Sequence, residues 1–322
     1  MVDGQGRSID YMRISVTDRC NLRCVYCMPK SGVSFVPETS LLTDDEIVRI
    51  VNASARAGIR HIKVTGGEPL LRDGITVLIR RIKEVPHIDT VSLTTNGILL
   101  PKYVDELYRA GISGVNISLD TLDEKRFRER TGGGKLTEAL KGLQVARTYP
   151  DLTVKVNTVL YKEHWEEDVQ ALVHLAEKAK VHVRFIEHMP LGTGEDEKPV
   201  AEQDVLRLLR EHYGEGKPCT EKIGEGPGHY FVFPGLLGRI GFISAMSHKF
   251  CSECNRIRLT ADGNLRMCLQ SREGVNLRER LRSGVSDEGL TELIEKSVCR
   301  KPAAHCMNER KIEAEGMCQI GG

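Results

Sequence analysis

The chain has few aromatic residues, almost no net charge and no long hydrophobic run. Phe, Trp and Tyr make up 5% of its 322 residues, with a single tryptophan, and the formal net charge is +1. A nearly neutral chain has no general attraction to nucleic acid or to an anionic membrane, so any anion site must be built locally. No run reaches the length of a transmembrane helix, and the polar N-terminus contains no signal-peptide core. We therefore expect a cytoplasmic protein that binds neither nucleic acid nor membrane.

Cysteine is the residue type that the chain has in excess, with ten copies. In a small secreted protein they would predict disulfides, but this chain is long and shows no secretion signal. In a reducing cytosol, clustered cysteines bind metal or carry out redox chemistry. The content of 40% hydrophobic and 28% charged residues is ordinary for a globular protein, and the length suits one large α/β domain or a barrel with an appendage.

The first 190 residues alternate short β-branched runs with amphipathic helical patterns. Strands are expected at 12–16, 61–65, 90–94, 114–119, 153–159 and 183–186, and helices near 43–58, 75–84, 102–110, 136–146 and 166–178. Thr43 and Glu46 have the spacing of a capping box, and Gly58 ends that helix. Six βα units predict a right-handed parallel sheet but are too few to close an eight-stranded barrel. We expect an α/β fold, an open, partial (β/α)6 TIM-type barrel with functional loops at the C-terminal ends of its strands.

The pattern changes after Pro190. Residues 191–197 and 214–228 are rich in Gly and Glu and are typical of loops, and short strand-like pieces follow within 231–269. We therefore predict a barrel over residues 1–190 and a C-terminal region over 191–322 that covers the barrel mouth.

A first cysteine set, Cys20, Cys24 and Cys27, has CxxxCxxC spacing in the loop after the first expected strand. A 4Fe–4S cubane has four irons, so three thiolates leave one iron open to a small molecule. A zinc site usually takes four ligands from paired elements, which three cysteines fit poorly. The spacing therefore favours an iron–sulfur cluster.

A second cysteine set, Cys251, Cys254 and Cys268, repeats the three-thiolate pattern. A second cluster is the direct inference, but a structural zinc with a fourth ligand such as His248 fits the spacing nearly as well. Arg256 and Arg258 alternate along an expected strand and should share one face. Two guanidinium groups there could bind phosphate, or be solvated surface arginines.

The cysteine loop and the segment Thr65-Gly66-Gly67-Glu68-Pro69 resemble the radical S-adenosylmethionine superfamily. The resemblance narrows to the GTP 3′,8-cyclase family of molybdenum cofactor biosynthesis and covers nearly the whole chain. It is carried by YMRISVTDRCNLRCVYCMP, KVTGGEPLLR, TTNG, NISLDTLD, VKVNTVL, RFIEHMP and CSECNRIRLTADGNLRMCL, and by the C-terminal Gly321 and Gly322.

The resemblance implies a lyase with two 4Fe–4S clusters and S-adenosylmethionine as cofactors. In the family, a 5′-deoxyadenosyl radical removes hydrogen from C3′ of GTP, and the carbon radical attacks C8 of guanine to give 3′,8-cyclo-7,8-dihydro-GTP. The second cluster binds the guanine, and the double-glycine tail supports radical formation. The resemblance further implies a homodimer, a reductant such as flavodoxin or ferredoxin, and handover to cyclic pyranopterin monophosphate synthase.

The matching motifs also imply site residues. Contacts to S-adenosylmethionine are implied for Tyr26, Gly67, Ser118 and Met189, and contacts to GTP for Arg13, Lys63, Thr94, Lys155, Arg256, Ile257 and Arg258. Lys63 stands where the family often has arginine, so the charge is kept but bidentate geometry is lost. Taken without the family, Gly67 could simply serve a tight turn, Thr94 and Ser118 could be strand-end hydroxyls, Met189 core and Lys155 a solvated residue.

The remaining cysteines fit neither set. Cys219, Cys299, Cys306 and Cys318 are expected to be structural or incidental free thiols, with Cys318 exposed near the tail. Two other functions compete with the cyclase. A peptide- or haem-modifying radical enzyme would have a longer C-terminal region with more cluster cysteines. A non-enzymatic zinc-binding module would have no need of Tyr26 or the Gly-Gly-Glu loop.

Overall fold

The computed structural model describes residues 1–28, 32–190, 199–271, 273–305 and 317–320. Six strands and the helices between them follow one another along the first 190 residues. They are β1 (Tyr11–Ser15), α1 (Asp44–Ala57), β2 (His61–Thr65), α2 (Ile75–Lys83), β3 (Thr90–Thr95), α3 (Leu100–Arg109), β4 (Gly114–Ser118), α4 (Glu124–Arg130), α5 (Leu136–Ala146), β5 (Thr153–Val159), α6 (Trp165–Lys178) and β6 (His182–Ile186), with 3-10 turns η1 (Glu38–Ser40) and η2 (Pro69–Leu71).

The rest of the chain adds strands to both edges of the same sheet. Its elements are α7 (Glu202–Tyr213), β7 (Lys217–Pro218), β8 (His229–Val232), β9 (Ile240–Ile243), η3 (Cys251–Glu253), β10 (Arg256–Leu259), β11 (Asn264–Arg266), β12 (Gly274–Asn276), α8 (Leu277–Arg282), α9 (Asp287–Cys299) and α10 (Met317–Ile320). The strand order is β12-β11-β10-β1-β2-β3-β4-β5-β6-β9-β8-β7. β10 is parallel to β1 and β9 is parallel to β6, whereas β11, β12, β8 and β7 are antiparallel to their neighbours.

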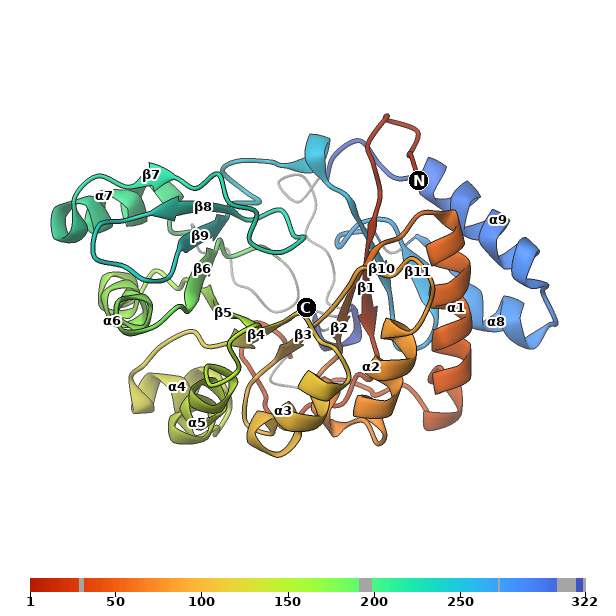
Figure 1. Ribbon diagram of the computed structural model, residues 1–322, viewed down its shortest axis with the longest axis horizontal. Coiled ribbons are helices and arrows are strands. Elements are labelled where there is room, and N and C mark those ends of the chain that lie inside the picture. The colour runs from red at the N-terminus through yellow and green to blue at the C-terminus, as the bar shows by residue number, and fades with distance from the viewer. Residues whose placement is uncertain (29–31, 191–198, 272, 306–316, 321–322) are drawn as a thin grey trace.

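The expected open, partial barrel is confirmed. The sheet curves, and helices α1, α2, α3, α5 and α6 follow its outer side, while β7–β9 and β10–β12 lie at its two ends (Figure 1). The boundary predicted near residue 190 stays a prediction, because the strands beyond it share backbone hydrogen bonds with β1 and β6. Within the described ranges, no helix is both long and apolar enough to cross a membrane.

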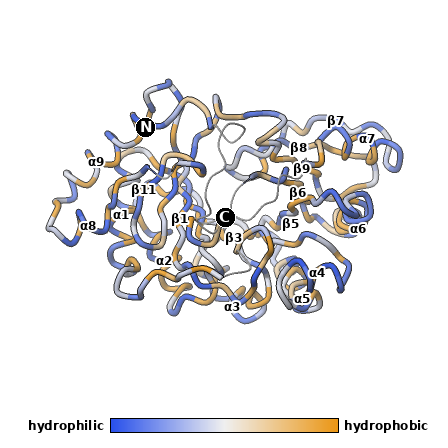
Figure 2. Tube along the Cα trace, turned by 180° about the vertical axis from the view of Figure 1, so that it is seen from behind, coloured by the Kyte–Doolittle hydropathy of each residue, from blue (hydrophilic) through white to orange (hydrophobic). Residues whose placement is uncertain are grey.

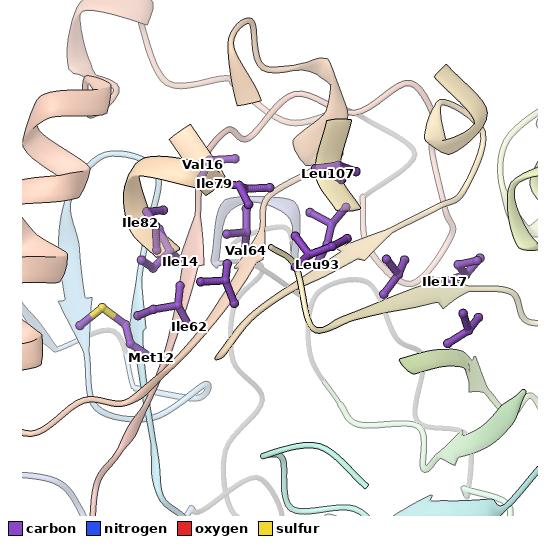
Figure 3. Packing of buried hydrophobic residues seen from close by; sticks show 14 of the residues in the cluster. Met12, Ile14, Val16, Ile62, Val64, Ile79, Ile82, Leu93, Leu107 and Ile117 are labelled. Atoms are coloured by element: carbon purple, nitrogen blue, oxygen red, sulfur yellow. The ribbon is translucent and has the colours of Figure 1, made fainter. Parts of the chain in front are cut away.

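The two faces of the central strands have opposite chemistry because side chains alternate along a strand. The outward face is aliphatic and packs on the helices; Figure 3 shows this layer, with Met12, Ile14, Ile62, Val64, Leu93 and Ile117 from the strands, Ile79 and Ile82 from α2 and Leu107 from α3. The inward positions carry polar side chains instead. A closed barrel of this type is usually filled with branched aliphatic residues. Here the interior is left open for a polar ligand.

Helix α1 begins and ends as its sequence predicts. The Thr43 hydroxyl accepts from the Glu46 amide (3.2 Å), and the Thr43 amide donates to the Glu46 carboxylate (2.8 Å). Gly58 ends the helix with φ of 115°, a left-handed value that favours glycine. α9 packs beside α1, and the Arg49 Nε–Asp287 Oδ1 ion pair joins them at 2.6 Å. In Figure 2 much of α6 and α8 is coloured as hydrophilic, as expected for surface helices.

Candidate active site

Both cysteine sets line one cavity at the C-terminal ends of the barrel strands. The cavity measures about 260 Å³. Cys20, Cys24 and Cys27 reach it from the loop after β1, and the second set reaches it from η3, from the residue after η3 and from the segment after β11. The four residues implied for S-adenosylmethionine line the same cavity: Tyr26, Gly67, Ser118 and Met189.

Each cysteine set brings three thiols to the wall of the shared cavity. Within the described ranges, no three His, Cys, Asp or Glu side chains are grouped so as to hold a single metal ion. A tetrahedral zinc site draws its sulfurs to one point, whereas the thiolates of a cubane bind different irons and lie farther apart. A cubane with one open iron needs three thiolates, which is the number that each set supplies.

The two cysteine sets differ in their electrostatic surroundings. Burial raises the pKa of the Cys20 thiol to about 11 and that of Cys24 further, so these thiols are protonated until they bind metal. Burial also acts on Cys254, but the charges of Arg256 and Lys301 outweigh it and bring the Cys254 pKa down to about 7. Cys254 therefore lies in a basic environment that stabilises its thiolate.

The Gly-Gly-Glu loop after β2 is pressed against the first cysteine loop. A Cβ atom on Gly67 would lie 2.3 Å from the Arg19 carbonyl oxygen. The Gly67 amide donates to the Thr17 carbonyl at 2.7 Å, and the Glu68 amide donates to the Arg19 carbonyl at 2.7 Å. The buried Glu68 carboxylate accepts from the Thr95 hydroxyl and the Asn96 amide, both at 2.8 Å. The motif thus joins the loops that follow β1, β2 and β3.

We expect Gly67→Ala to destabilise the metal-free protein by about 1–3 kcal/mol, because backbone atoms of the cysteine loop must move to admit a methyl group. Urea unfolding followed by circular dichroism measures this, and iron uptake should fall with it. Gly289→Ala in α9 is the control, because its Cβ would meet only the side chains of Val285 and Ser286. Equal stability of the Gly67 variant and the wild type would contradict the required close approach.

Six cationic side chains project into the barrel interior, and we call them the interior basic cluster. They are Arg13 on β1, Lys63 on β2, Lys155 on β5, Arg184 on β6, and Arg256 and Arg258 on β10. A second cavity of about 230 Å³ is lined by five of them, all but Arg258. Arg13, Arg184 and Arg256 also line the cavity with the cysteines, so one ligand can contact both regions.

Among the described residues that line the second cavity, Glu225 is the one carboxylate, and it pairs with Lys222 and His61. Of the described carboxylates, none lies within ion-pair distance of Arg13, Lys63, Lys155 or Arg184. Burial lowers the pKa of Arg13 to about 10 and that of Lys63 well below its usual value. Burial and the neighbouring Arg184 lower the pKa of Lys155 to about 7. Because buried cations are costly without a counter-charge, the arrangement favours a polyanionic ligand.

Neutral acceptors hold the basic side chains in place. Arg184 donates to Asn157 Oδ1 from Nε (3.1 Å) and Nη2 (2.8 Å). With its side-chain amide turned over, as the surrounding donors require, Asn116 accepts through its oxygen from Arg184 Nη2 (3.2 Å) and Lys63 Nζ (3.1 Å). Lys155 Nζ donates to the Ile223 carbonyl at 2.9 Å. These bonds fix the orientation of the basic side chains toward the two cavities.

The expected alternation on β10 is confirmed. Arg256 and Arg258 line the cavity with the cysteines, and Arg258 lies beside Arg13 in the parallel register. Arg256 also stacks on the Phe250 ring, with its guanidinium carbon 5.1 Å from the ring centroid. The Ile257 side chain is fully buried in the core on the other face. Any ligand contact of Ile257 must therefore come from its backbone.

Sequence patterns missed Arg184 and Lys301 at the site and gave the wrong burial for Cys318. Arg184 shares the inward face of β6 and could have been found from the alternation along RFIEHMP. Lys301 lines the cavity from the loop after α9, and no local pattern marks it. The expectation that Cys318 is exposed was wrong: it is 1% exposed, its thiol interacts with that of Cys27, and the Met317 amide donates to the Cys27 carbonyl at 2.9 Å.

Other expected features fall elsewhere. Cys219 is a partly buried free thiol and Cys299 an exposed one, as expected. Cys306, Gly321 and Gly322 lie outside the described residues.

Comparison with known proteins gives two family matches. Residues 14–176 match the Radical SAM superfamily, and residues 181–307 match Molybdenum Cofactor Synthesis C. Relatives named GTP 3′,8-cyclase include a Clostridium perfringens protein, 44% identical over 327 residues, and a Petrotoga mobilis protein, 42% identical over 331 residues. Each alignment covers 100% of both chains.

Solved structures share the fold. Streptococcus suis SuiB matches with a TM-score of 0.64 at 16% identity, covering 97% of this chain and 78% of that one. SuiB bound to S-adenosylmethionine matches with a TM-score of 0.61 at 15% identity over the same shares of the two chains. The family assignment comes from the sequence relatives: the chain belongs to the radical S-adenosylmethionine superfamily and, within it, to the GTP 3′,8-cyclase family.

Proposed function

We propose that this protein is a radical S-adenosylmethionine enzyme that converts GTP to 3′,8-cyclo-7,8-dihydro-GTP, the first step of molybdenum cofactor synthesis. The proposal rests on the connection between the cavity lined by the cysteines and the cavity lined by the interior basic cluster. Both cysteine sets line one cavity, and Arg13, Arg184 and Arg256 connect it to the interior basic cluster. Such a space suits a ligand that has a polyanionic group at one end and a group that reacts with a radical at the other.

The first cysteine set would hold the cluster that generates the radical. When bound there, a 4Fe–4S cluster supplies the electron that splits S-adenosylmethionine and releases a 5′-deoxyadenosyl radical. Cys20, Cys24 and Cys27 leave one iron position free, and Tyr26 and Gly67 line the adjoining cavity wall. Ser118 and Met189 line the same cavity. Their part is to orient the cofactor and exclude water.

GTP would lie with its triphosphate against the interior basic cluster and its guanine toward the second cysteine set. Arg13, Lys63 and Lys155 provide positive charge that no described carboxylate neutralises within ion-pair distance. Thr94 lines the cavity, and its buried hydroxyl has no hydrogen-bond partner among the described residues. An orphaned buried hydroxyl is favourable only when a ligand completes its hydrogen bond.

Several finer features belong to the same proposal. A second 4Fe–4S cluster would occupy Cys251, Cys254 and Cys268, with its open iron toward guanine. The C-terminal Gly321 and Gly322 would support radical formation. A homodimer in the cytoplasm, reduction by flavodoxin or ferredoxin, and handover of the product to cyclic pyranopterin monophosphate synthase are proposed with it.

Anaerobic reconstitution with iron and sulfide tests the proposal. After addition of reductant, S-adenosylmethionine and GTP, we expect about eight irons per chain, as two cubanes require, together with 5′-deoxyadenosine and a fluorescent pterin after oxidative workup. Arg256→Ala should keep the iron and lose GTP turnover. About one zinc per chain and no 5′-deoxyadenosine would overturn the proposal in favour of a zinc-binding module.

GTP affinity should fall as the pH rises above about 7, by up to about tenfold per pH unit. Lys155 has a pKa of about 7 in the ligand-free protein, so at higher pH it must take up a proton to pair with phosphate. Calorimetry in buffers of different ionisation enthalpy measures this uptake as a buffer-dependent heat.

The control for this prediction is Lys155→Arg, which stays charged and should flatten the pH dependence. The groups that act on Lys155 are Arg184, Glu225, Lys63 and His182. If Lys155→Arg keeps the full slope, the proton goes to another group, either one of these or the phosphate itself, and the assignment to Lys155 fails.

A further inference from the structure

Two buried cations, Lys301 and Arg7, donate hydrogen bonds to the backbone around the second cysteine set. No sequence motif predicted a role for either residue. Lys301 follows α9 and is 4% exposed. Its ammonium donates to the carbonyl oxygens of Arg256 (2.8 Å) and Met267. Arg256 lies two residues after Cys254, and Met267 immediately precedes Cys268. One ammonium therefore bridges the two segments that carry these two cysteines.

Arg7 makes the corresponding connection for the third cysteine. Its Nη1 donates to the Cys251 carbonyl at 2.7 Å, and its Nη2 donates to the Pro302 carbonyl at 2.7 Å. The cysteine loop is thereby tied to the segment that follows Lys301. Asp3 pairs with Arg7 Nε at 2.6 Å and neutralises its charge. Arg7 thus fixes the position of the Cys251 loop but adds little net charge to the site.

Lys301 differs from Arg7 in having no such partner. Of the described carboxylates, none lies within ion-pair distance of its ammonium. Cys254 and Cys268 are the groups that favour its charged form, as thiolates, whereas Arg7 and Arg256 oppose it. Lys301 also lines the cavity that both cysteine sets share. A buried ammonium in this position is stabilised when the cysteines carry negative charge.

We propose that Lys301 is a positioning residue for the second cysteine set that also tunes the cluster held there. Its two hydrogen bonds set the spacing between Cys254 and Cys268, and its charge stabilises the more negative, reduced form of the cluster. The reduction potential therefore becomes less negative. This inference rests on the proposed second cluster.

The test uses the reconstituted full chain and compares Lys301→Met with Lys301→Arg. Iron is counted per chain, and both clusters are titrated by electron paramagnetic resonance. In Lys301→Met, we expect the reduced-to-oxidised ratio of the second cluster to fall about tenfold at the wild-type midpoint potential, because one nearby positive charge is lost. Lys301→Arg should stay near the wild type, and the first cluster should not shift in either variant.

Lys296→Met is the matched control, because it removes a lysine from α9 that is exposed and paired with Glu292. It should leave both midpoints unchanged. If Lys301→Met fails to bind the second cluster while Lys301→Arg binds it, the positioning role is supported, and the potential is then read in Lys301→Gln. A second cluster with unchanged iron and midpoint in Lys301→Met and Lys301→Gln would overturn the inference. A wild-type protein with only about four irons would instead overturn the proposed second cluster.

Discussion

Cys24→Ala should abolish cleavage of S-adenosylmethionine and remove about half of the iron bound by the reconstituted protein. Cys24 lines the shared cavity between Cys20 and Cys27, and two thiolates cannot hold a cubane as three do. Iron analysis and chromatographic detection of 5′-deoxyadenosine measure the two effects. The fold should survive, because the cysteine loop keeps its backbone bonds: the Arg23 amide donates to the Thr131 carbonyl and the Val25 amide to the Arg130 carbonyl, both at 2.9 Å.

Cys299→Ala is the control for this experiment, because Cys299 is an exposed free thiol at the end of α9. It should keep all of the iron and all of the cleavage. Full iron content or undiminished 5′-deoxyadenosine in Cys24→Ala would show that the first cluster is held by other ligands. Buried Cys318, which contacts Cys27, is the nearest candidate for such a replacement.

Arg13→Met should act on ligand binding and on stability in opposite directions. Arg13 is half-buried, its buried Nε has no partner among the described residues, and its one described side-chain hydrogen bond runs from Nη2 to the Thr65 hydroxyl at 3.4 Å. Loss of a charge-assisted bond to phosphate should weaken GTP binding by about 1.5–3 kcal/mol, or roughly 10–100-fold. Without GTP, removal of a half-buried charge that lacks a carboxylate partner among the described residues should make the protein more stable.

Calorimetric titration with GTP and thermal melting without GTP separate the two effects. Iron content should not change, since Arg13 approaches neither cysteine loop by a described hydrogen bond. Arg147→Met is the control, because Arg147 is exposed after α5 and should alter neither measurement. If Arg13→Met lowers the melting temperature and leaves GTP affinity intact, Arg13 supports the fold rather than the phosphate.

Local patterns in the sequence were enough to place the strands and the first cysteine set. The six predicted barrel strands agree with β1–β6 to within about one residue at each end. The capping box at Thr43 and Glu46 is present, and Gly58 ends the helix. Such features depend on neighbours only a few residues away, through side-chain alternation, helix capping and turn conformation.

The C-terminal half was predicted less completely. Helices α7, α8 and α9 were not identified, although Ser286 caps α9 by accepting from the Gly289 amide at 3.1 Å, a pattern that the sequence contains. Cys318 was expected at the surface and is buried against Cys27, because burial of a terminal residue depends on where its segment docks. Local sequence carries no information about that docking.

The chain's own motifs determined which chemistry is available: three thiolates in each of two sets, a Gly-Gly-Glu loop and two arginines on one strand face. Only the tertiary structure decided that these groups serve one site. β10 pairs with β1, although the two strands are far apart in the sequence. This pairing places Arg258 beside Arg13 and both cysteine sets around one cavity. The same packing brings the Lys301 ammonium into hydrogen-bond contact with the segments that carry Cys254 and Cys268. Such long-range pairings follow from burial of the aliphatic strand faces over the entire sheet, and a local pattern does not specify them.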